Sequence, residues 1–365
     1  MQELDVVCEQ IECAQHPEDI FGVESNKVLV KNIFRQLSKV VHPDRNNGDA
    51  RANNAFVKLT EYYEGAIKKL TNGTYGDTLS EEQTNVSDSD SFTIQTRKNT
   101  YTITKTLAEG DLGVVYGGQI IGSVDDNSYK DLIAVKVVDD SADNDLMQNE
   151  IKILQLFKNN PANQLKHLPV LLDRFKTSDG QLGTIMKYID GYDLYSIREG
   201  LRWKYGIDQK HVVWMMNRTL SAIGYAHSQG CVHGNIDPSH IMIRPRDHNA
   251  WIIDWCYGAL NPAQTGDGFK VLNEEFSAPE VAQKKPPLPA SDLYSIGKTM
   301  IFALGGDVKT NAMPASVDAA LQRFLKFFVL ESPRQRAQDA WEMHAMLNDL
   351  VVELWGPKKF LEFQI

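Results

Sequence analysis

Cysteine is scarce in this sequence, and its positions favour neither a disulfide-bonded nor a zinc-bound fold. The 365 residues contain four cysteines, which are Cys8, Cys13, Cys231 and Cys256. Their spacing matches neither a disulfide framework nor a zinc site, so we expect a reducing, cytoplasmic environment. Proline and glycine are also few, at 14 and 25 residues, which excludes collagen-like and low-complexity chains.

Long hydrophobic runs and an excess of positive charge are absent as well. No apolar stretch approaches the ~20 residues that span a bilayer, and the first 30 residues contain no basic leader before an apolar run. We therefore expect no membrane span and no signal peptide. The formal net charge is -10, which argues against nucleic acid or an anionic membrane as a partner of the whole chain.

The remaining composition is that of a globular protein, and the chain divides into stretches of different character. Residues 1–78 have the pattern of helices. Residues 79–98 are polar and rich in Ser and Asp, which is typical of a flexible linker. Residues 99–355 alternate strands with a helix and then become mostly helical, and residues 356–365 form a C-terminal tail. We expect two domains joined by the linker.

The first domain contains two amphipathic segments. Apolar residues recur at helical spacing over 29–41 and again over 56–70, so we expect two antiparallel helices that bury these stripes against each other. The simplest interpretation is a helical hairpin whose charges face the solvent. Cations recur every fourth residue along the first helix and form a basic ridge, made of Lys27, Lys31, Arg35 and Lys39.

A His-Pro-Asp tripeptide stands between the two predicted helices, directly after the basic ridge. Over residues 19–70 this arrangement resembles the J-domain of DnaJ-family co-chaperones, which dock on a DnaK-type (heat-shock-70 class) chaperone and stimulate its ATPase. The Gly/Phe-rich stretch and the zinc-binding Cys repeats of DnaJ have no counterpart in this sequence, so the rest of the chain is of another kind. The resemblance implies that the partner-binding residues are His42, Pro43, Asp44, Lys31, Arg35 and Lys39.

Two features near the start of the second domain point to bound phosphates. Gly110 and Gly113 lie between two predicted strands, where glycine lets the backbone approach phosphate oxygens, and Val115 can cover a flat base. Lys136 lies inside an apolar strand, where an amine is not buried without a partner. Glu150, on the predicted helix that follows, offers this partner. The pair is either structural or a device that positions phosphates.

The motifs that follow resemble, in their order, those of the protein-kinase fold. A hinge-like segment at 186–191 precedes a catalytic-loop pattern at 232–240, a metal-loop pattern at 252–256 and an Ala-Pro-Glu at 278–280. The family holds adenine with the backbone of the hinge and ends its activation segment at the Ala-Pro-Glu. The order of these motifs over most of the second domain makes the resemblance specific.

This resemblance implies a bilobal fold with a β-rich N-lobe at 99–189 and a helical C-lobe at 190–355. Together with the all-α J-domain hairpin, the expected fold class is α+β. The resemblance also implies ATP and Mg²⁺ as cofactors, and Arg336 as the partner of Glu280. The residues implied to bind the nucleotide are Gly110, Gly113, Val115, Ala134, Lys136, Glu150, Met186, Lys187, Ile189 and Met242, and those implied to bind metal are Asp254 and His240.

The catalytic loop departs from the family pattern at several positions. Asn235 stands where the family has the aspartate that orients the substrate hydroxyl, and an amide has no basic lone pair to accept a proton. Asp237 replaces a phosphate-contacting lysine, and His240 replaces a metal-binding asparagine. The strand lysine, its glutamate partner and the metal-loop aspartate are retained. The sequence therefore favours nucleotide binding with altered chemistry.

These departures leave three hypotheses open, in order of preference. The first is a J-domain co-chaperone with an ATP-binding pseudokinase domain that regulates it or binds a client, because the His-Gly-Asn triplet at 233–235 resembles the pseudokinase domains of Janus kinases. The second is an unusual but active Ser/Thr kinase, targeted by its J-domain, in which Asp237 reaches the substrate hydroxyl or binds metal with Asp254. The third is an interaction scaffold that binds no nucleotide.

Overall fold

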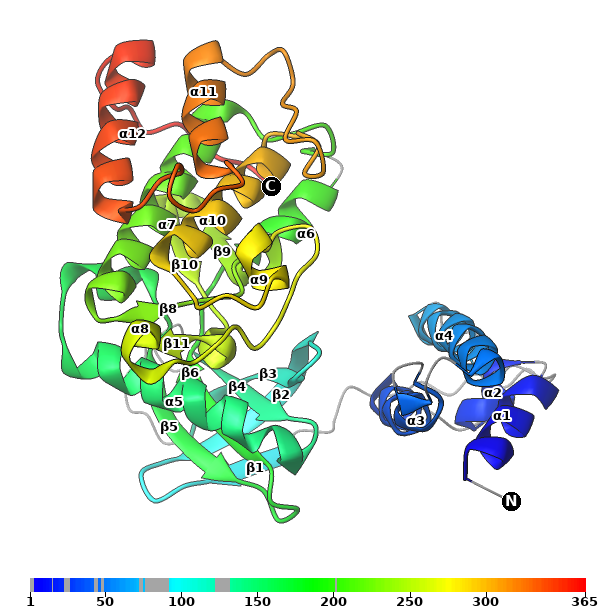
Figure 1. Ribbon diagram of the computed structural model, residues 1–365. Coiled ribbons are helices and arrows are strands. Elements are labelled where there is room, and N and C mark those ends of the chain that lie inside the picture. The colour runs from blue at the N-terminus through cyan, green and yellow to red at the C-terminus, as the bar shows by residue number, and fades with distance from the viewer. Residues whose placement is uncertain are drawn as a thin grey trace. The chain divides into compact units, whose positions relative to one another are not determined.

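The computed structural model of the chain describes residues 3–14, 16–22, 27–42, 45–46, 49–71, 75, 92–121, 132–200 and 202–365. The chain divides into two units, Met1–Asp88 and Ser89–Ile365, which are drawn in Figure 1. None of the helices formed by the described residues has both the length and the apolar character needed to cross a bilayer.

The N-terminal unit is helical in its described part. The two helices predicted for this region are present as α3 and α4, and their apolar stripes meet, with Val30 and Val41 buried beside Leu59. Phe34 and Tyr63 stack across the same interface, with ring centroids 4.3 Å apart. Two further helices complete the buried cluster. The elements are α1 Glu3–Cys13, α2 Pro17–Phe21, α3 Lys27–Val41 and α4 Ala50–Thr71.

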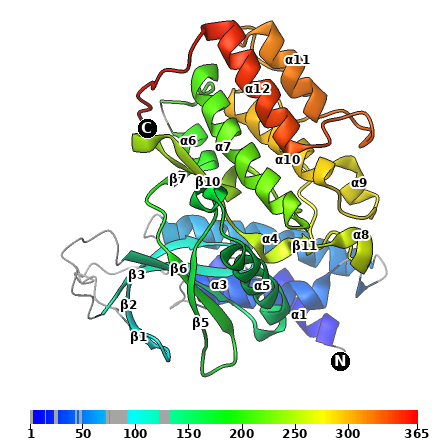
Figure 2. The same ribbon diagram turned by 90° about the vertical axis from the view of Figure 1, so that its left-hand side faces the viewer.

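A twisted antiparallel sheet forms the first part of the second unit. The sheet has six strands in the order β1-β2-β3-β4-β6-β5, and α5 (Asn144–Asn159) packs against it (Figure 2). Alternate residues of the strands point into a shared core, including Tyr101, Ile133 and Ile185. The strands are β1 Phe92–Gln95, β2 Thr100–Glu109, β3 Gly113–Ile120, β4 Leu132–Val138, β5 Leu171–Lys176 and β6 Leu182–Lys187.

The linker predicted at 79–98 is wrong at its C-terminal end. Residues 92–95 form β1, which pairs with β2 so that Phe92 lies opposite Ile103. Phe92 also meets the Tyr116 ring edge-on at 5.6 Å, so aromatic packing and strand pairing place this segment in the sheet. The earlier part of the predicted linker, 79–91, lies outside the described residues.

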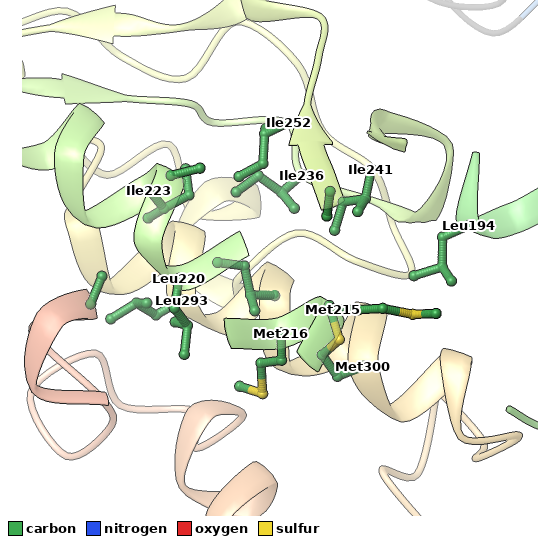
Figure 3. Close-up of a cluster of buried hydrophobic side chains, with 14 of the residues drawn as sticks. Leu194, Met215, Met216, Leu220, Ile223, Ile236, Ile241, Ile252, Leu293 and Met300 are labelled. Carbon is green, nitrogen blue, oxygen red and sulfur yellow. The ribbon is translucent and has the colours of Figure 1, made fainter. Parts of the chain in front are cut away.

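Helices dominate the second part of this unit. Buried side chains of α7 and α10, including Leu220, Leu293 and Met300, pack around Ile236 and Ile241 beneath the loop at 233–240 (Figure 3). This core gives the loop a rigid base. The helices are α6 Leu194–Glu199, α7 Gln209–Ser228, α8 Pro262–Thr265, α9 Pro279–Ala282, α10 Pro289–Ala303, α11 Ala319–Phe328 and α12 Ala340–Trp355.

Short strands and an ordered C-terminal segment complete the helical part. Phe363 lies in the predicted tail, yet it is buried and stacks on Trp203 at 5.4 Å, with His211 on a neighbouring side at 4.8 Å. The tail is therefore part of the fold at this residue. The strands are β7 Tyr192–Asp193, β9 Ile241–Arg244 and β10 Asn249–Ile252 in one sheet, and β8 Cys231–Val232 and β11 Ala259–Leu260 in another.

A buried ion pair anchors the segment that leads into α10. Arg336 Nη2 lies 2.5 Å from Glu280 Oε2, and both side chains are almost fully buried, at 0% and 1% exposure. Ser291 donates a further hydrogen bond to Glu280 Oε1 at 2.7 Å. The pairing of these two residues predicted from the sequence is confirmed.

Removing one partner of this pair is expected to lower the free energy of unfolding more than removing an exposed charge does. Arg336→Met leaves the Glu280 carboxylate buried without its cation, so the free energy of unfolding should fall by about 3–5 kcal/mol. Urea denaturation measures it. Arg334→Met, at an exposed arginine two residues away, is the matched control and should change stability by less than about 0.5 kcal/mol. Equal effects of the two substitutions would contradict this role.

Candidate functional site

A deep cleft of about 810 Å³ lies between the sheet and the helical part of the second unit. Strands β2, β3 and β4 supply one wall, and the loop after β8 and the loop after β10 supply the other. The structure thus brings the residues predicted for nucleotide, metal and catalysis to one place. Those that line the cleft are Gly110, Gly113, Val115, Ala134, Lys136, Glu150, Met186, Lys187, Ile189, Asn235, Asp237, His240, Met242 and Asp254.

Gly110 and Gly113 are under different steric constraints. A side chain at Gly113 would place its Cβ 1.9 Å from the Val137 carbonyl oxygen of β4, so close strand packing demands glycine there. A Cβ at Gly110 would meet only the Gly113 carbonyl at 3.6 Å. The Gly110 N–H donates to that same carbonyl at 2.9 Å and closes the hairpin. Strand packing thus requires glycine at position 113 independently of phosphate, and the role of both glycines in phosphate approach stays a prediction.

Lys136 is buried between two carboxylates that come from different elements. Its Nζ lies 3.2 Å from Glu150 Oε2 on α5 and forms an ion pair with Asp254 Oδ1. Burial disfavours the ammonium, yet the charges of Asp254 and Glu150 outweigh this cost and raise the pKa of Lys136 well above its usual value. Burial likewise opposes ionisation of Asp254, but Lys136 and then His240 hold its pKa well below the usual range. Both groups are charged at neutral pH.

Contacts made by α5 hold the loop that carries Asp254. Glu150 uses its second oxygen to accept a hydrogen bond from the Trp255 backbone N–H at 3.1 Å. Asn149 donates to the carbonyls of Cys256 and Gly258 at 2.9 and 2.8 Å. These contacts fix Asp254 in a left-handed backbone conformation, with φ 65°, which costs a non-glycine residue energy. Asn149 was not predicted as a site residue.

The buried carboxylate of Asp292 on α10 clamps the start of the catalytic loop. It accepts hydrogen bonds from the backbone N–H groups of His233 and Gly234 at 2.8 and 2.9 Å, and from His227 Nε2 at 2.9 Å. The His233 ring reaches the Ile253 carbonyl at 3.0 Å and ties this loop to the Asp254 loop. Sequence reasoning assigned Asp292 no role at the site.

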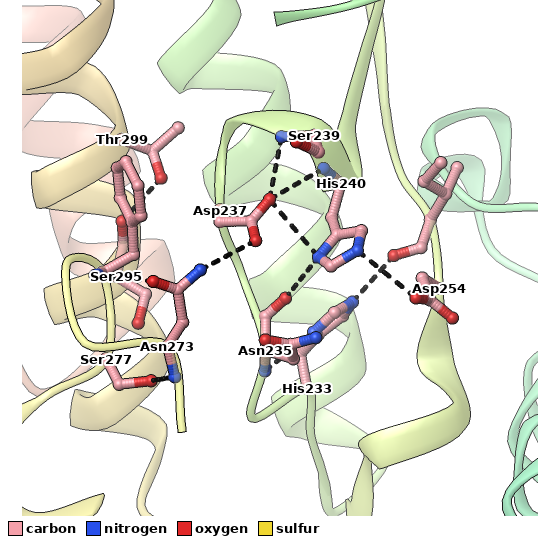
Figure 4. Close-up of polar contacts among 12 residues, drawn as sticks. His233, Asn235, Asp237, Ser239, His240, Asp254, Asn273, Ser277, Ser295 and Thr299 are labelled. Atoms are coloured by element: carbon pink, nitrogen blue, oxygen red, sulfur yellow. Dashed lines mark hydrogen bonds and ion pairs between the residues drawn. The ribbon is translucent and has the colours of Figure 1, made fainter. Parts of the chain in front are cut away.

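Asp237 projects a carboxylate whose oxygens are both engaged by donors, as Figure 4 shows. Oδ1 accepts from the N–H groups of Ser239 and His240 at 2.8 and 3.2 Å, which caps the 3₁₀ turn at 238–240. Oδ2 accepts from Asn273 at 3.1 Å. Asn235, at the family's aspartate position, is buried and offers an amide to the cleft. Asn273 is a further cleft residue that sequence reasoning missed.

Both ring nitrogens of His240 face oxygen atoms. Nδ1 lies 2.8 Å from the Asn235 carbonyl and 3.4 Å from Asp237 Oδ1, and Nε2 lies 3.3 Å from Asp254 Oδ2 (Figure 4). Burial opposes the charge, but the hydrogen bond and charge of Asp254, followed by the charge of Asp237, raise the pKa of His240 to about 9. His240 is therefore an imidazolium at neutral pH, with a proton on each nitrogen.

A metal ion at His240 would have to displace a ring proton, because an imidazolium has no free lone pair for a cation, so the metal role of His240 stays a prediction. Among the described residues, no group of three or more His, Cys, Asp or Glu side chains is arranged to hold a metal ion. Mg²⁺ is usually held by one or two carboxylates together with substrate phosphates. Asp254, which lines the cleft, suits that manner of binding, so the residues present fit one Mg²⁺ bound together with a nucleotide.

The residues predicted to bind a chaperone partner lie on the N-terminal unit. Lys31 and Arg35 of α3 are half-buried and Lys39 is exposed, so the predicted ridge is less open to solvent than its spacing suggested. The His42 ring meets the Phe56 ring edge-on at 5.4 Å, which fixes it at the end of α3. The other two tripeptide residues, Pro43 and Asp44, lie outside the described residues.

The sequence was compared with known proteins. The family model described as "Protein kinase domain" matches residues 101–355. The chain is 25% identical over 258 residues to serine/threonine-protein kinase pkn3 of Myxococcus xanthus, covering 67% of this chain and 44% of that protein. It is 25% identical over 203 residues to serine/threonine-protein kinase F of Synechocystis, covering 50% and 40%. The chain thus spans less than half the length of these curated relatives.

The raised pKa of His240 predicts that the stability of the folded protein depends on pH. A histidine whose pKa rises from 6.5 to about 9 on folding stabilises the fold fully below pH 6.5 and loses that contribution as pH rises through 9. The difference in free energy of unfolding between wild type and His240→Gln should therefore shrink by on the order of 3 kcal/mol between pH 6 and pH 10. Urea denaturation at the two pH values measures it.

His344 provides the control for this experiment. Burial, then the charges of Lys358 and Arg218, lower its pKa, so its contribution changes with pH in the opposite direction. The difference between wild type and His344→Gln should not decrease on going from pH 6 to pH 10. A His240 difference that stays constant across the range would show that folding does not raise the pKa of the ring.

Proposed function

Because the chain belongs to the protein kinase family, matched over residues 101–355, we propose that its second unit binds ATP in the cleft and transfers the terminal phosphoryl group to Ser or Thr hydroxyls of proteins. The observation that carries this proposal is the buried Lys136 ammonium, held between Glu150 and Asp254. The matched relatives are named as serine/threonine kinases. These findings favour this alternative over the co-chaperone with a pseudokinase, which the sequence alone ranked first.

Different residues of this chain position the phosphates, the metal ion and the substrate hydroxyl. Bound ATP with Mg²⁺ supplies the phosphoryl group and neutralises its oxygens. Lys136 provides a fixed positive charge for the phosphates, and Asp254 provides the carboxylate for the metal. Asp237 is the acidic side chain of the catalytic loop that lines the cleft, and it is fixed by the 3₁₀ turn and Asn273. It takes the place of the missing aspartate in orienting the substrate hydroxyl.

A specific observation favours a second candidate, the ATP-binding pseudokinase. Asn235 cannot accept a proton at neutral pH, and His240 holds a positive charge against Asp254 where a metal would bind. Positioning and electrostatics account for most of phosphoryl transfer, so these replacements lower the rate without removing the binding site. The two candidates share ATP binding and differ in turnover.

The function test combines turnover with binding. Wild-type protein with labelled ATP, Mg²⁺ and a generic protein substrate should transfer label to Ser or Thr. Asp237→Asn keeps the shape of the side chain and removes its charge, so the rate should fall about 10²- to 10⁴-fold, while ATP at a hundred times its Kd still stabilises the protein by about 2.7 kcal/mol. Asp179→Asn, at an exposed loop aspartate, is the control and should keep the wild-type rate.

Each outcome of this test separates the candidates. Stabilisation by ATP that is lost in Lys136→Ala, without label transfer by wild type, would establish the pseudokinase. Neither stabilisation nor transfer would favour the scaffold hypothesis. Transfer that persists in Asp254→Asn would indicate a contaminating kinase.

We also propose that the N-terminal unit is a J-domain that docks on a DnaK-type chaperone. The support is the tripeptide at 42–44 following the basic residues of α3, and the packing of α3 against α4. A basic helix that meets an acidic partner surface gains association rate and orientation more than affinity. In this proposal the kinase domain acts on, or responds to, proteins that the chaperone recruits in a reducing cytoplasm.

The J-domain proposal predicts a selective loss in one variant. His42→Gln should reduce stimulation of a DnaK-type chaperone's ATPase to the unstimulated rate, because the predicted contact is removed. Single-turnover ATP hydrolysis by the chaperone measures it. His16→Gln, at an exposed histidine of the same unit, should keep full stimulation, and circular dichroism should show unchanged helix content for both. Stimulation that is equal in both variants, or absent from wild type, would contradict the proposal.

A further inference from the structure

A second pocket lies on the helical part of the second unit, separate from the cleft. It encloses about 380 Å³ between α7, α12 and the C-terminal segment 356–361, and it shares none of its lining residues with the cleft. The pocket is formed by segments that are far apart in the sequence. Nothing in the proposed kinase chemistry uses it.

The charges that line this pocket are nearly all positive. The lining acid is Asp247, and its carboxylate is already paired with Arg244 through contacts of 2.9 and 2.6 Å. No carboxylate of the described residues lies within ion-pair distance of any lining cation. The cations are Lys210 and Arg218 from α7, and Lys358 and Lys359 from the C-terminal segment.

Arg218 and Lys358 both line the pocket, and each donates a hydrogen bond to a neutral group. Arg218 Nε donates to the His248 carbonyl at 3.4 Å, and Lys358 Nζ donates to Asn348 Oδ1. Burial and then the charge of Arg218 lower the pKa of Lys358. An anion bound in this pocket would reduce the repulsion between these two cations.

The walls of the pocket are flat and apolar. Trp214 stacks on the His248 ring at 4.3 Å with the planes nearly parallel, and Phe360 stacks on His248 at 4.2 Å. Trp355 lines the pocket as well, and Lys210 lies over its ring at 6.0 Å. A ligand of this pocket would thus meet both cationic groups and aromatic rings.

From this arrangement we propose that the pocket binds a phosphate monoester, with Arg218 and Lys358 on the phosphate and the aromatic wall on the ester group. A guanidinium offers paired donors that match phosphate oxygens, and an ammonium adds a point charge. A pocket of about 380 Å³ has room for a phosphate with a small organic group. The ester is either a free small molecule or a phosphorylated side chain of a protein.

The experiment uses the full wild-type chain, because the second unit depends on the buried ammonium of Lys136, and the pocket substitutions below separate this site from the cleft. Inorganic phosphate, phenyl phosphate and a phosphoserine peptide are titrated at constant ionic strength. Tryptophan fluorescence provides a local readout because Trp214 and Trp355 line the pocket, and calorimetry confirms the affinity. We expect saturable binding of phenyl phosphate that is tighter than that of inorganic phosphate.

Substitutions locate the binding. Arg218→Gln and Lys358→Gln should each weaken phenyl phosphate at least tenfold, while Arg218→Lys, which keeps the charge, should weaken it less. Arg323→Gln, at an exposed arginine of α11, is the matched control and should bind as the parent does. Unchanged melting temperatures exclude misfolding, and ¹⁵N NMR shifts of α7 and α12 provide a second measure.

Three results would overturn the proposal: no saturable binding of any probe, binding that is insensitive to Arg218→Gln and Lys358→Gln, or equal displacement by chloride. Tighter binding of the phosphoserine peptide would identify a protein source for the ester. Tighter binding of phenyl phosphate would identify a small-molecule source.

Discussion

The ammonium group of Lys136 is the interaction on which the second unit depends. It sits in an otherwise apolar strand, where a charge without partners is very unfavourable, and it is stable there because α5 and the loop after β10 each supply a carboxylate. Removal of either partner leaves uncompensated charge, so the sheet, the helix and the loop adopt their positions together. The same three groups line the cleft. This network of ion pairs therefore determines both the packing of the region and the charges available in the cleft.

The loop around Asp254 shows how contacts from α5 stabilise a strained backbone conformation. A non-glycine residue at positive φ is unfavourable by itself. Here Glu150 accepts from the following backbone N–H, and Asn149 binds two carbonyls further on. The helix therefore holds the backbone after Asp254 at three points. His240 completes the arrangement from the catalytic loop, so that a carboxylate meets two cations before any ligand arrives.

Much of this site could be predicted from the sequence, because its residues lie in short motifs with characteristic neighbours. Lys136 stands out within an apolar strand, and the altered catalytic loop is visible as a departure at Asn235. Asp292, Asn149 and Asn273 were missed, because their importance arises from hydrogen bonds to groups far away in the chain. Strand β1 was missed for a related reason, since it is only four residues long, follows a polar stretch, and is defined by its pairing with β2. The requirement for glycine at Gly113 is likewise set by a neighbouring strand.

The aromatic packing of Phe363 bears on where the kinase-like fold ends. The family match stops at residue 355, but Phe363 stacks on Trp203 and contacts His211 beyond that point. A fragment cut at the family boundary would lack Phe363. The faces of the Trp203 and His211 rings that Phe363 covers would then be exposed to water. The minimal autonomous folding piece is accordingly longer than the homologous one, and shortened versions would be prone to self-association through the uncovered rings.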